Sequence, residues 1–353
     1  MRFILISLCL ITIASCSEED TSVVNDWGPM PRINLDRDAA ALPVIDTSQD
    51  SGTTPRDASM PQEVVDAVTQ MQPPVTSPED MRVSEPPPQQ MSDFSQRGSY
   101  EVQQERASAM VTNCNISYSV YTPVGIPNPP IVILGHGFAR GSGAMSGWAE
   151  HLSSWGVEVV LPTLCHYNVF TGVDHEMNGQ NMRELAGNNR VVYAGHSAGG
   201  LAAIIAASQD DNALGVLGLD ATDTQDVPGV RNFIGRDYAG NVSVPTFGII
   251  GEPSTCNADN SGLDLYRLIE RKRVVKVTSS DHCDYESPTN FGCTSNCENR
   301  ETEFLDDDIR PVITALGTAA IMSLTGLSSD GDIMWSAQGL NDWVMSGMVQ
   351  DIE

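Results

Sequence analysis

Basic residues are scarce in this chain of 353 residues. Lysine and arginine together number 19, against 46 aspartates and glutamates, so the formal net charge at pH 7 is −27. Proteins that bind nucleic acids need clustered positive charge to neutralise the phosphates. The shortage of positive charge therefore argues against nucleic acid as a partner, and the excess of acid favours a soluble surface whose charges repel one another.

The apolar segment at the N-terminus lacks the length of a membrane-spanning helix. It runs from Phe3 to Ile13, whereas a spanning helix needs about 20 apolar residues. With Arg2 before it, the segment is typical of an export signal. Ile13-Ala14-Ser15-Cys16 resembles a bacterial lipobox, in which the cysteine is lipidated and becomes the new N-terminus. A plain secretory peptide cleaved nearby is the alternative.

We therefore expect residues 1–16 to be a lipoprotein signal peptide, with lipidation at Cys16. The expected location is outside the cytoplasm, with the lipid anchor in a membrane. Ser17, in place of an aspartate, favours the outer membrane or its periplasmic face.

Residues 17–98 lack the apolar side chains that a folded core requires. The segment is rich in Pro, Ser, Asp, Glu, Gln and Thr, and such a composition buries too little apolar surface to offset the entropy lost on ordering. We predict a disordered, acidic and proline-rich linker over residues 17–98, which tethers a folded domain of residues 99–353 to the membrane.

Cysteine is sparse but even in number beyond the signal segment. An even count in an exported chain favours disulfides, and we expect most of these cysteines to pair in one of fifteen possible connectivities. Cys293 with Cys297, close in sequence, and Cys256 with Cys283, on loops expected at the same sheet edge, are two candidate pairings. A zinc site at Cys283, Cys293 and Cys297 is the alternative, but their spacing fits no common zinc pattern. We expect neither a metal nor a cofactor. The six cysteines are Cys114, Cys165, Cys256, Cys283, Cys293 and Cys297.

The most informative stretch of the chain surrounds Ser197. A β-branched apolar run leads into Gly-x-Ser-x-Gly at residues 195–199, and the alanine-rich segment 201–207 follows. This order predicts a buried strand, a sharp turn and a helix, with Ser197 at the apex of the turn. Glycines at 195 and 199 allow strand and helix to approach closely, and the helix N-terminus is aimed at Ser197 Oγ. A glycine-rich turn with an inert serine is the alternative.

The rest of the domain alternates between strands and helices. Continuously apolar runs of this kind are typical of strands buried on both faces of a parallel sheet, and their alternation with helices predicts a doubly wound, mostly parallel α/β sheet. The segment from Ala109 to Thr122 is strand-rich, and residues 165–178 are irregular. The expected strands are 131–134, 157–161, 191–195, 214–219, 244–250 and 274–277, and the expected helices include 148–155, 201–207, 263–269 and 309–324.

The shortage of histidines narrows the choice of catalytic base. A serine hydroxyl is a poor nucleophile at neutral pH and needs a base within hydrogen-bonding reach. In the fold that this serine motif indicates, the chain order is Ser, acid, His. His282 is the single histidine after Ser197, and it follows the last predicted strand, where a loop at the carboxyl edge of the sheet can reach Ser197. A surface histidine is the alternative.

Two backbone amides are expected to stabilise the oxyanion that forms during attack on a carbonyl. One is the amide of Ala198, directly after the nucleophile. The other is the amide of Phe138, in the loop Gly135-His136-Gly137-Phe138 after a predicted strand. His136 and His196 are interpreted as residues that pack and stabilise turns.

A carboxylate that orients the histidine would complete a serine–histidine–acid triad, and three acidic residues are candidates for it. Asp220 ends a predicted core strand and ranks first, Glu252 follows the next strand and ranks second, and Asp223 ranks third. The acidic run Asp306–Asp308 could suggest a calcium site. We prefer to interpret it as the start of a helix, where acidic residues complement the helix dipole.

The motifs from Ile131 onward resemble the α/β-hydrolase superfamily, and within it the chlorophyllase-like and polyester-hydrolase-like esterases. The resemblance covers roughly residues 100–325. In chlorophyllase-like members the acid follows the strand after the nucleophile helix, which matches Asp220, whereas polyester hydrolases place it one strand later. The motifs that carry the resemblance are Gly135-His136-Gly137-Phe138, Gly195-His196-Ser197-Ala198-Gly199-Gly200, Gly218-Leu219-Asp220, Val244-Pro245-Thr246 and Asp281-His282-Cys283-Asp284.

The resemblance implies an α/β-hydrolase fold and a serine esterase. Together with the predicted signal peptide it leads us to expect an exported esterase, and we expect a monomer. Ser197, His282 and Asp220 would cleave a small or polymeric carboxylic ester through an acyl-enzyme. Two alternatives remain: a catalytically silent binding lipoprotein of the same fold, and a peptidase or amidase that uses the same triad.

Overall fold

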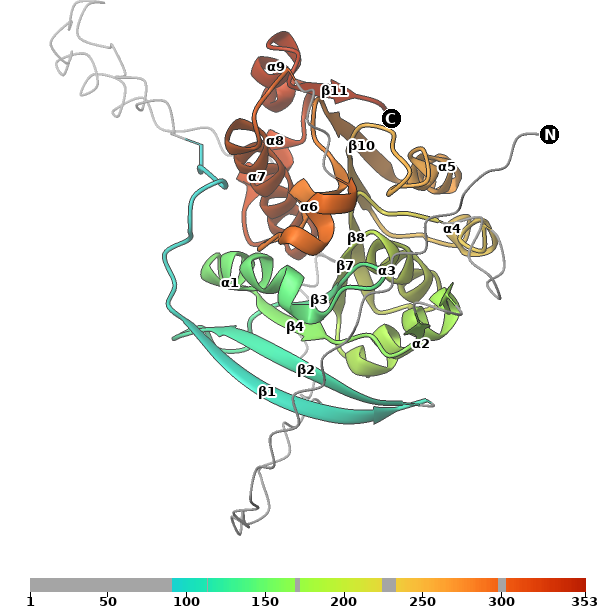
Figure 1. The fold of residues 1–353 in the computed structure, drawn as a ribbon. Coiled ribbons are helices and arrows are strands. Elements are labelled where there is room, and N and C mark those ends of the chain that lie inside the picture. Colours follow the sequence, from blue (N-terminus) through green and yellow to red (C-terminus); the bar gives the residue numbers. More distant parts are fainter. Residues whose placement is uncertain (1–90, 113, 169–171, 224–232, 298–302) are drawn as a thin grey trace, which may run out of the picture. The chain divides into compact units, whose positions relative to one another are not determined.

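Figure 1 shows the fold of the chain in a computed structural model. The structure describes residues 91–112, 114–168, 172–223, 233–297 and 303–353. The predicted signal peptide with Cys16, and residues 17–90 of the predicted linker, lie outside the described residues. Within the described ranges, no helix is both long and apolar enough to cross a membrane.

A nine-stranded sheet forms the centre of the domain, with the strand order β1-β2-β4-β3-β7-β8-β9-β10-β11. The six central strands β4-β3-β7-β8-β9-β10 pair with one another in parallel. The pairs β1–β2, β2–β4 and β10–β11 are antiparallel. The strands are β1 (Val102–Val111), β2 (Cys114–Pro123), β3 (Ile131–Gly135), β4 (Glu158–Pro162), β7 (Val191–His196), β8 (Ala213–Leu219), β9 (Thr246–Ile250), β10 (Lys272–Val277) and β11 (Val349–Asp351). A second, two-stranded sheet pairs β5 (Tyr167–Asn168) with β6 (Gly172–Val173).

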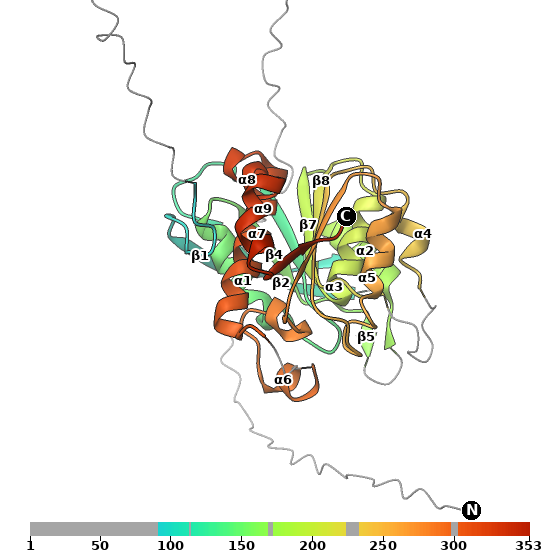
Figure 2. The same cartoon turned by 90° about the horizontal axis from the view of Figure 1, so that it is seen from above.

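Helices cover both faces of the sheet, as Figures 1 and 2 show. One face packs against α1, α7, α8 and α9, and the other against α2, α3, α4 and α5, so that two hydrophobic clusters lie on opposite sides of the strands. The helices are α1 (Ser146–Ser154), α2 (His175–Ala186), α3 (Ala198–Ser208), α4 (Arg236–Ala239), α5 (Ser261–Leu268), α6 (Phe291–Cys297), α7 (Asp306–Thr325), α8 (Ser329–Met334) and α9 (Ala337–Met345), with 3₁₀ turns η2 (Ser142–Met145) and η3 (His282–Tyr285).

The mixed α/β class with a mostly parallel sheet agrees with the prediction. Every residue of β7 is buried, which is why its apolar run shows no alternation with polar residues. Because the central strands are parallel, their carboxyl ends meet at one edge of the sheet, and the loops that leave β3, β7, β8, β9 and β10 gather there.

Two regions differ from the expected elements. The segment expected to be strand-rich from Ala109 is a hairpin of two ten-residue strands, and its first strand already begins at Val102. Beyond the expected closing helix, which is α7, the chain continues through α8 and α9 to β11. Strand β11 pairs Val349 with Val277. Its three residues are too few to show a periodicity, and only the long-range pairing makes them a strand.

The last residues of the predicted linker pack against the domain. Ser92 donates hydrogen bonds from its amide and its hydroxyl to Asp330 Oδ2, at 2.9 and 2.6 Å. Phe94 is fully buried, and its ring lies 4.9 Å from that of Trp155. The amide of Gly98 donates to Ser154 Oγ at 2.8 Å. Described residues of the predicted linker, from Ser92 to Gly98, therefore pack against the folded domain.

Candidate active site

Ser197 occupies a sharp turn between β7 and α3. Its φ of 56° and ψ of −124° lie outside the regions that residues with a Cβ readily adopt, and such a conformation persists only where surrounding contacts hold it. The amide of Ser197 donates to the carbonyl of Leu219 at 3.0 Å, and its own carbonyl accepts from the amide of Thr222 at 3.2 Å. The turn is therefore fixed to the end of the neighbouring strand β8.

Glycines around the turn allow three backbone segments to meet. A Cβ on Gly195 would clash with the backbone of Gly199, and a Cβ on Gly199 would clash with the backbone of Gly135 and with the carbonyl of His136. The sequence motif thus brings the start of α3 against both β7 and the loop after β3, as the spacing of its small residues predicts.

The structure brings His282 and Asp220 together. His282 Nδ1 donates to Asp220 Oδ2 over 2.6 Å, and both residues are buried. Asp220 follows β8 with a φ of 44°, and its amide donates to the carbonyl of Ile249 at 2.7 Å. This arrangement holds the imidazole in the tautomer that leaves Nε2 free to accept a proton.

Neither of the other two candidate acids contacts His282. Glu252 turns away and accepts hydrogen bonds from Lys276 Nζ at 2.9 Å and from the amide of Ser279 at 3.2 Å. Asp223 is buried and accepts from the amide of Gly235 at 3.0 Å. Burial raises the pKa of Asp223 to about 6. Among the three candidates, only Asp220 is placed to orient the base.

The turn that carries His282 is closed by its own acidic residues. Asp281 Oδ1 accepts from the amide of Cys283 at 2.7 Å, and Asp284 Oδ2 accepts from the amide of Asp281 at 2.8 Å. This reciprocal capping fixes the start of η3, so the position of His282 is set by local hydrogen bonds as well as by β10.

His196 supports His282 from the side on which Ser197 lies. Its Nε2 donates to the carbonyl of His282 at 3.0 Å, and the two rings lie 4.5 Å apart. Burial, followed by the charge of His282, holds the pKa of His196 well below its usual value. His196 is therefore neutral and fixes the His282 segment beside the turn that carries Ser197.

No hydrogen bond joins Ser197 Oγ to His282 Nε2 within the part of the chain that the structure describes. The two residues are connected indirectly. His196, which precedes Ser197, is hydrogen-bonded to the carbonyl of His282, and the amide of Ser197 is hydrogen-bonded to Leu219, which precedes Asp220. In serine hydrolases, the hydrogen bond between the serine and its histidine base is often long without substrate and tightens when substrate binds.

The loop after β3 borders the nucleophile. A Cβ on Gly137 would lie 3.2 Å from Ser197 Cβ and the same distance from His196 Nδ1. Phe138 follows in this loop and is half-buried. Ala198 is the first residue of α3, where a backbone N–H has no acceptor within the helix. The two amides expected to bind an oxyanion thus belong to segments that meet at Ser197.

His136 holds the same loop in place. Its Nδ1 donates to the carbonyl of Gly137 at 2.8 Å, and its Nε2 accepts from the amide of Leu164 at 3.0 Å. Burial lowers the pKa of His136 to about 4, so the ring is neutral at physiological pH. A neutral ring is required here, because Nε2 acts as an acceptor.

A buried ion pair, which sequence reasoning missed, joins the loop after β3 to the His282 turn. Arg140 Nε and Nη2 donate to the two carboxylate oxygens of Glu286, at 2.6 and 2.8 Å, and Nη2 also donates to Asn290 Oδ1 at 2.9 Å. The side chain of Glu286 is fully buried. No local pattern could have found this pair, because its members lie 146 residues apart.

The cysteines pair differently from the two candidate pairings named above, which are wrong. The bridges are Cys114–Cys165, Cys256–Cys297 and Cys283–Cys293. Residues 293 and 297 lie one turn apart in α6, and each meets a different loop: Cys293 meets the residue after His282, and Cys297 meets the loop that follows β9.

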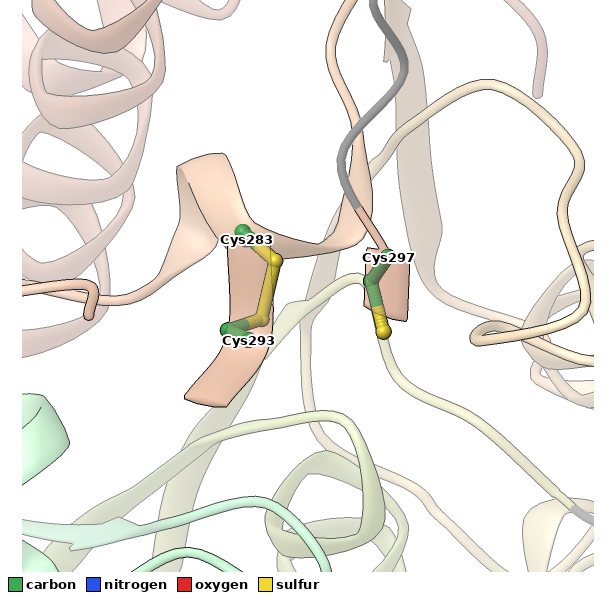
Figure 3. A group of neighbouring side chains, drawn as sticks. All are labelled: Cys283, Cys293 and Cys297. Carbon is green, nitrogen blue, oxygen red and sulfur yellow. A yellow bond between two sulfur atoms is a disulfide. The ribbon is translucent and has the colours of Figure 1, made fainter. Parts of the chain in front are cut away.

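The sulfurs of Cys283, Cys293 and Cys297 lie within 4.8 Å of one another. Figure 3 shows the Cys283–Cys293 bridge with Cys297 beside it but not bonded to it. Zinc binds cysteine as the thiolate. All three sulfurs belong to disulfides, so with both bridges formed the cluster offers no thiolate to a metal.

No known family model matches the chain, and no curated protein matches its sequence.

Proposed function

We propose that this chain is a serine ester hydrolase of the α/β-hydrolase fold. Four features support the proposal: a nucleophile at the turn between a parallel strand and a helix, a loop after β3 beside it, a base after the last parallel strand, and the chain order Ser197, Asp220, His282. This arrangement of elements and this chain order are typical of the α/β-hydrolases.

The observation that carries the proposal is the Asp220–His282 pair at the edge of the sheet where Ser197 lies. Burying a carboxylate 2.6 Å from the Nδ1 of a buried histidine carries a desolvation cost, and a functional role would explain why the pair is kept. Orienting a general base and stabilising its protonated form is such a role. The buried pair, the strained serine and the glycine-lined loop occur together at one edge of the sheet, which an inert glycine-rich turn would not require.

The proposed mechanism follows from these positions. Ser197 Oγ attacks the ester carbonyl while His282 Nε2 takes the serine proton, and Asp220 stabilises the imidazolium. The amides of Ala198 and Phe138 donate to the oxyanion. His282 then returns the proton to the leaving alcohol, and water, activated by the same base, hydrolyses the acyl-enzyme. Apart from the ester and the hydrolytic water, these steps use side chains and backbone groups of the chain.

The proposal is tested with short-chain p-nitrophenyl esters and the purified domain, with Ser197→Ala as the control. We expect turnover in the wild type that the variant lacks. Equal rates in both would overturn the proposal and favour a catalytically silent binding protein. Faster Ser197-dependent cleavage of p-nitroanilides than of the matched esters would instead identify an amidase or peptidase.

We also propose that the chain is exported and anchored through a lipid on Cys16, in the outer membrane or at its periplasmic face. The short apolar segment ending in Ile-Ala-Ser-Cys supports this, and three disulfides in the folded part fit an oxidising compartment. Mass spectrometry of the membrane-extracted N-terminus is the test. A mature N-terminus at another residue, without lipid, would contradict it.

A further inference from the structure

Asn257 lies in the loop between β9 and α5 and is fully buried. Its Nδ2 donates to both oxygens of Asp220, at 3.2 Å to Oδ2 and 3.4 Å to Oδ1, and to the carbonyl of Glu252 at 2.9 Å. Its Oδ1 accepts from the amides of Ser254 at 2.8 Å and Asn260 at 3.1 Å. The hydrogen-bonding capacity of the side-chain amide is therefore used on both sides.

This set of partners fixes the orientation of the amide. If the amide were flipped, Oδ1 would face the carboxylate of Asp220 and the carbonyl of Glu252, and the NH₂ group would face two backbone donors. Each of these contacts would be repulsive, so only the observed orientation satisfies the network. Asn257 consequently directs its donors at the acid that orients His282.

Among the described residues, the donors to the Asp220 carboxylate other than His282 belong to the loop after β9. Besides His282, its carboxylate accepts from the amide of Gly251 at 3.0 Å and from Asn257. Donors to a carboxylate stabilise its charged form and restrict its rotation. Gly251 holds Oδ1 and Asn257 holds both oxygens, so the carboxylate is oriented toward His282 Nδ1 by groups that, within the described ranges, form hydrogen bonds to neither Ser197 nor His282.

We propose that Asn257 is a positioning residue of the active site, which acts through Asp220 to keep the carboxylate aimed at His282. This inference rests on the proposed hydrolase function. It gives a role to the loop after β9, although Glu252 of that loop bonds to Lys276 and Ser279 and not to His282. The loop supplies the acid with two hydrogen-bond donors in place of supplying the acid itself.

The chain offers a matched pair of variants for the test. Asn257→Asp keeps the side-chain shape but replaces the donor with a carboxylate that faces Asp220. Asn260→Asp introduces the same charge three residues away, where the side chain donates to the carbonyl of Gly251 and, among the described residues, to no atom of Asp220 or His282. Residue 260 has a φ of 62°, which asparagine and aspartate both tolerate. Thermal unfolding of both variants reports on any general damage to the loop.

We expect Asn257→Asp to lower kcat/KM by about 10- to 100-fold, the range expected for loss of a hydrogen bond to a charged group. The added negative charge stabilises the protonated form of His282, so the acid limb of the pH profile of kcat/KM should move to higher pH. Asn260→Asp should keep kcat/KM within about threefold and leave the limb in place. Unchanged kcat/KM and an unchanged limb in Asn257→Asp would overturn the inference, as would equal effects of the two variants.

A second measurement separates this inference from the proposed function. The proton in the short hydrogen bond between His282 Nδ1 and Asp220 should give a downfield resonance in a proton NMR spectrum, whether or not the protein turns over an ester. We expect this resonance to shift or vanish in Asn257→Asp and to persist in Asn260→Asp. If the wild type shows no Ser197-dependent turnover but the resonance responds in this way, the positioning role stands and the hydrolase function fails. If the resonance is unaffected by Asn257→Asp, the positioning role is overturned.

Discussion

The two sides of the candidate site are built in different ways. The nucleophile side comes from two short segments, residues 135–138 and 195–200, whose glycines allow close backbone contact. The base side is assembled from the loops after β8, β9 and β10, in which Asp220, Asn257 and His282 meet across 25 to 62 residues of sequence. The first depends on local backbone geometry and the second on long-range hydrogen bonds, so the two sides should respond differently to substitution.

The largest expected effect lies on the nucleophile side. Ser197→Ala removes the attacking oxygen, and we expect kcat for a short-chain p-nitrophenyl ester to fall by about 10⁶, since loss of a catalytic serine costs about as much as loss of the whole triad. Stopped assays at high enzyme concentration measure the residual rate. A fall of less than tenfold would show that another group performs the attack, and thermal unfolding checks that the turn survives the substitution.

The next largest effect lies on the base side. Asp220→Asn keeps the size of the acid but presents the wrong partner to His282 Nδ1, and we expect kcat to fall by about 10⁴ because the imidazole is held in the wrong tautomer. Steady-state kinetics above KM provide the measurement.

Glu252→Gln is the control for this substitution. Glu252 bonds to Lys276 and to the amide of Ser279 rather than to His282, so we expect kcat within a few-fold of the wild type. A crippled Glu252→Gln together with a near-normal Asp220→Asn would show that the triad uses the loop after β9, as in the polyester hydrolases.

The difference between local backbone geometry and long-range hydrogen bonds also explains which parts of the site could be predicted from the sequence. The turn at Ser197 could be predicted because its residues are contiguous and their small size has one clear physical reading. The α/β class followed from apolar runs that alternate with helices, and His282 followed from chain order. Asp220 could be ranked but not chosen, because two parallel strands end at the same edge of the sheet and each offers an acidic residue.

The remaining parts of the site carry no local signal. Asn257 is one asparagine in a polar loop, and its role depends on a carboxylate 37 residues earlier. Likewise, the helix α6 determines which cysteines meet, so the even cysteine count could not give the pairing. Contacts of this kind depend on tertiary packing, which residue types and spacing do not specify.

A third prediction concerns the ion pair that ties the two sides together. Arg140→Met leaves the buried carboxylate of Glu286 without its bidentate partner, and loss of one member of a buried pair costs about 3–5 kcal/mol. We expect the free energy of unfolding to fall by about 3 kcal/mol in chemical denaturation. The matched control is Arg97→Met, since Arg97 and Glu150 are 3.8 Å apart and both mostly exposed; such surface pairs contribute about 0–1 kcal/mol. Equal losses in both variants would show that the Arg140–Glu286 pair does not join the two sides.

The smallest expected effect is a change in the pH dependence of stability, with opposite signs on the two sides. On the nucleophile side, the pKa of His136 is lowered to about 4 in the folded chain, against about 6.5 when unfolded. The unfolded chain therefore takes up the proton first as pH falls from 6.5 toward 4, and the stability contributed by neutral His136 is lost over that window. On the base side, burial and the charge of Asp281 raise the pKa of Asp284 to about 6. Here the folded chain takes up the proton first, so stability is gained as pH falls below about 6 toward the usual value of an aspartate.

Between pH 6.5 and 4.5 each of these two groups changes the unfolding free energy by about 2 kcal/mol, and in the wild type the two changes oppose each other. Asp284→Asn removes the gain, so this variant should lose about 2 kcal/mol more than the wild type on acidification across that window. His136→Asn removes the loss, so acidification should destabilise it less than the wild type by a similar amount, whatever its stability at pH 6.5. Chemical denaturation at the two pH values gives each difference directly. If both variants follow the wild-type pH dependence, neither group carries a shifted pKa, and the contrast between the neutral histidine of one side and the protonatable carboxyl of the other is wrong.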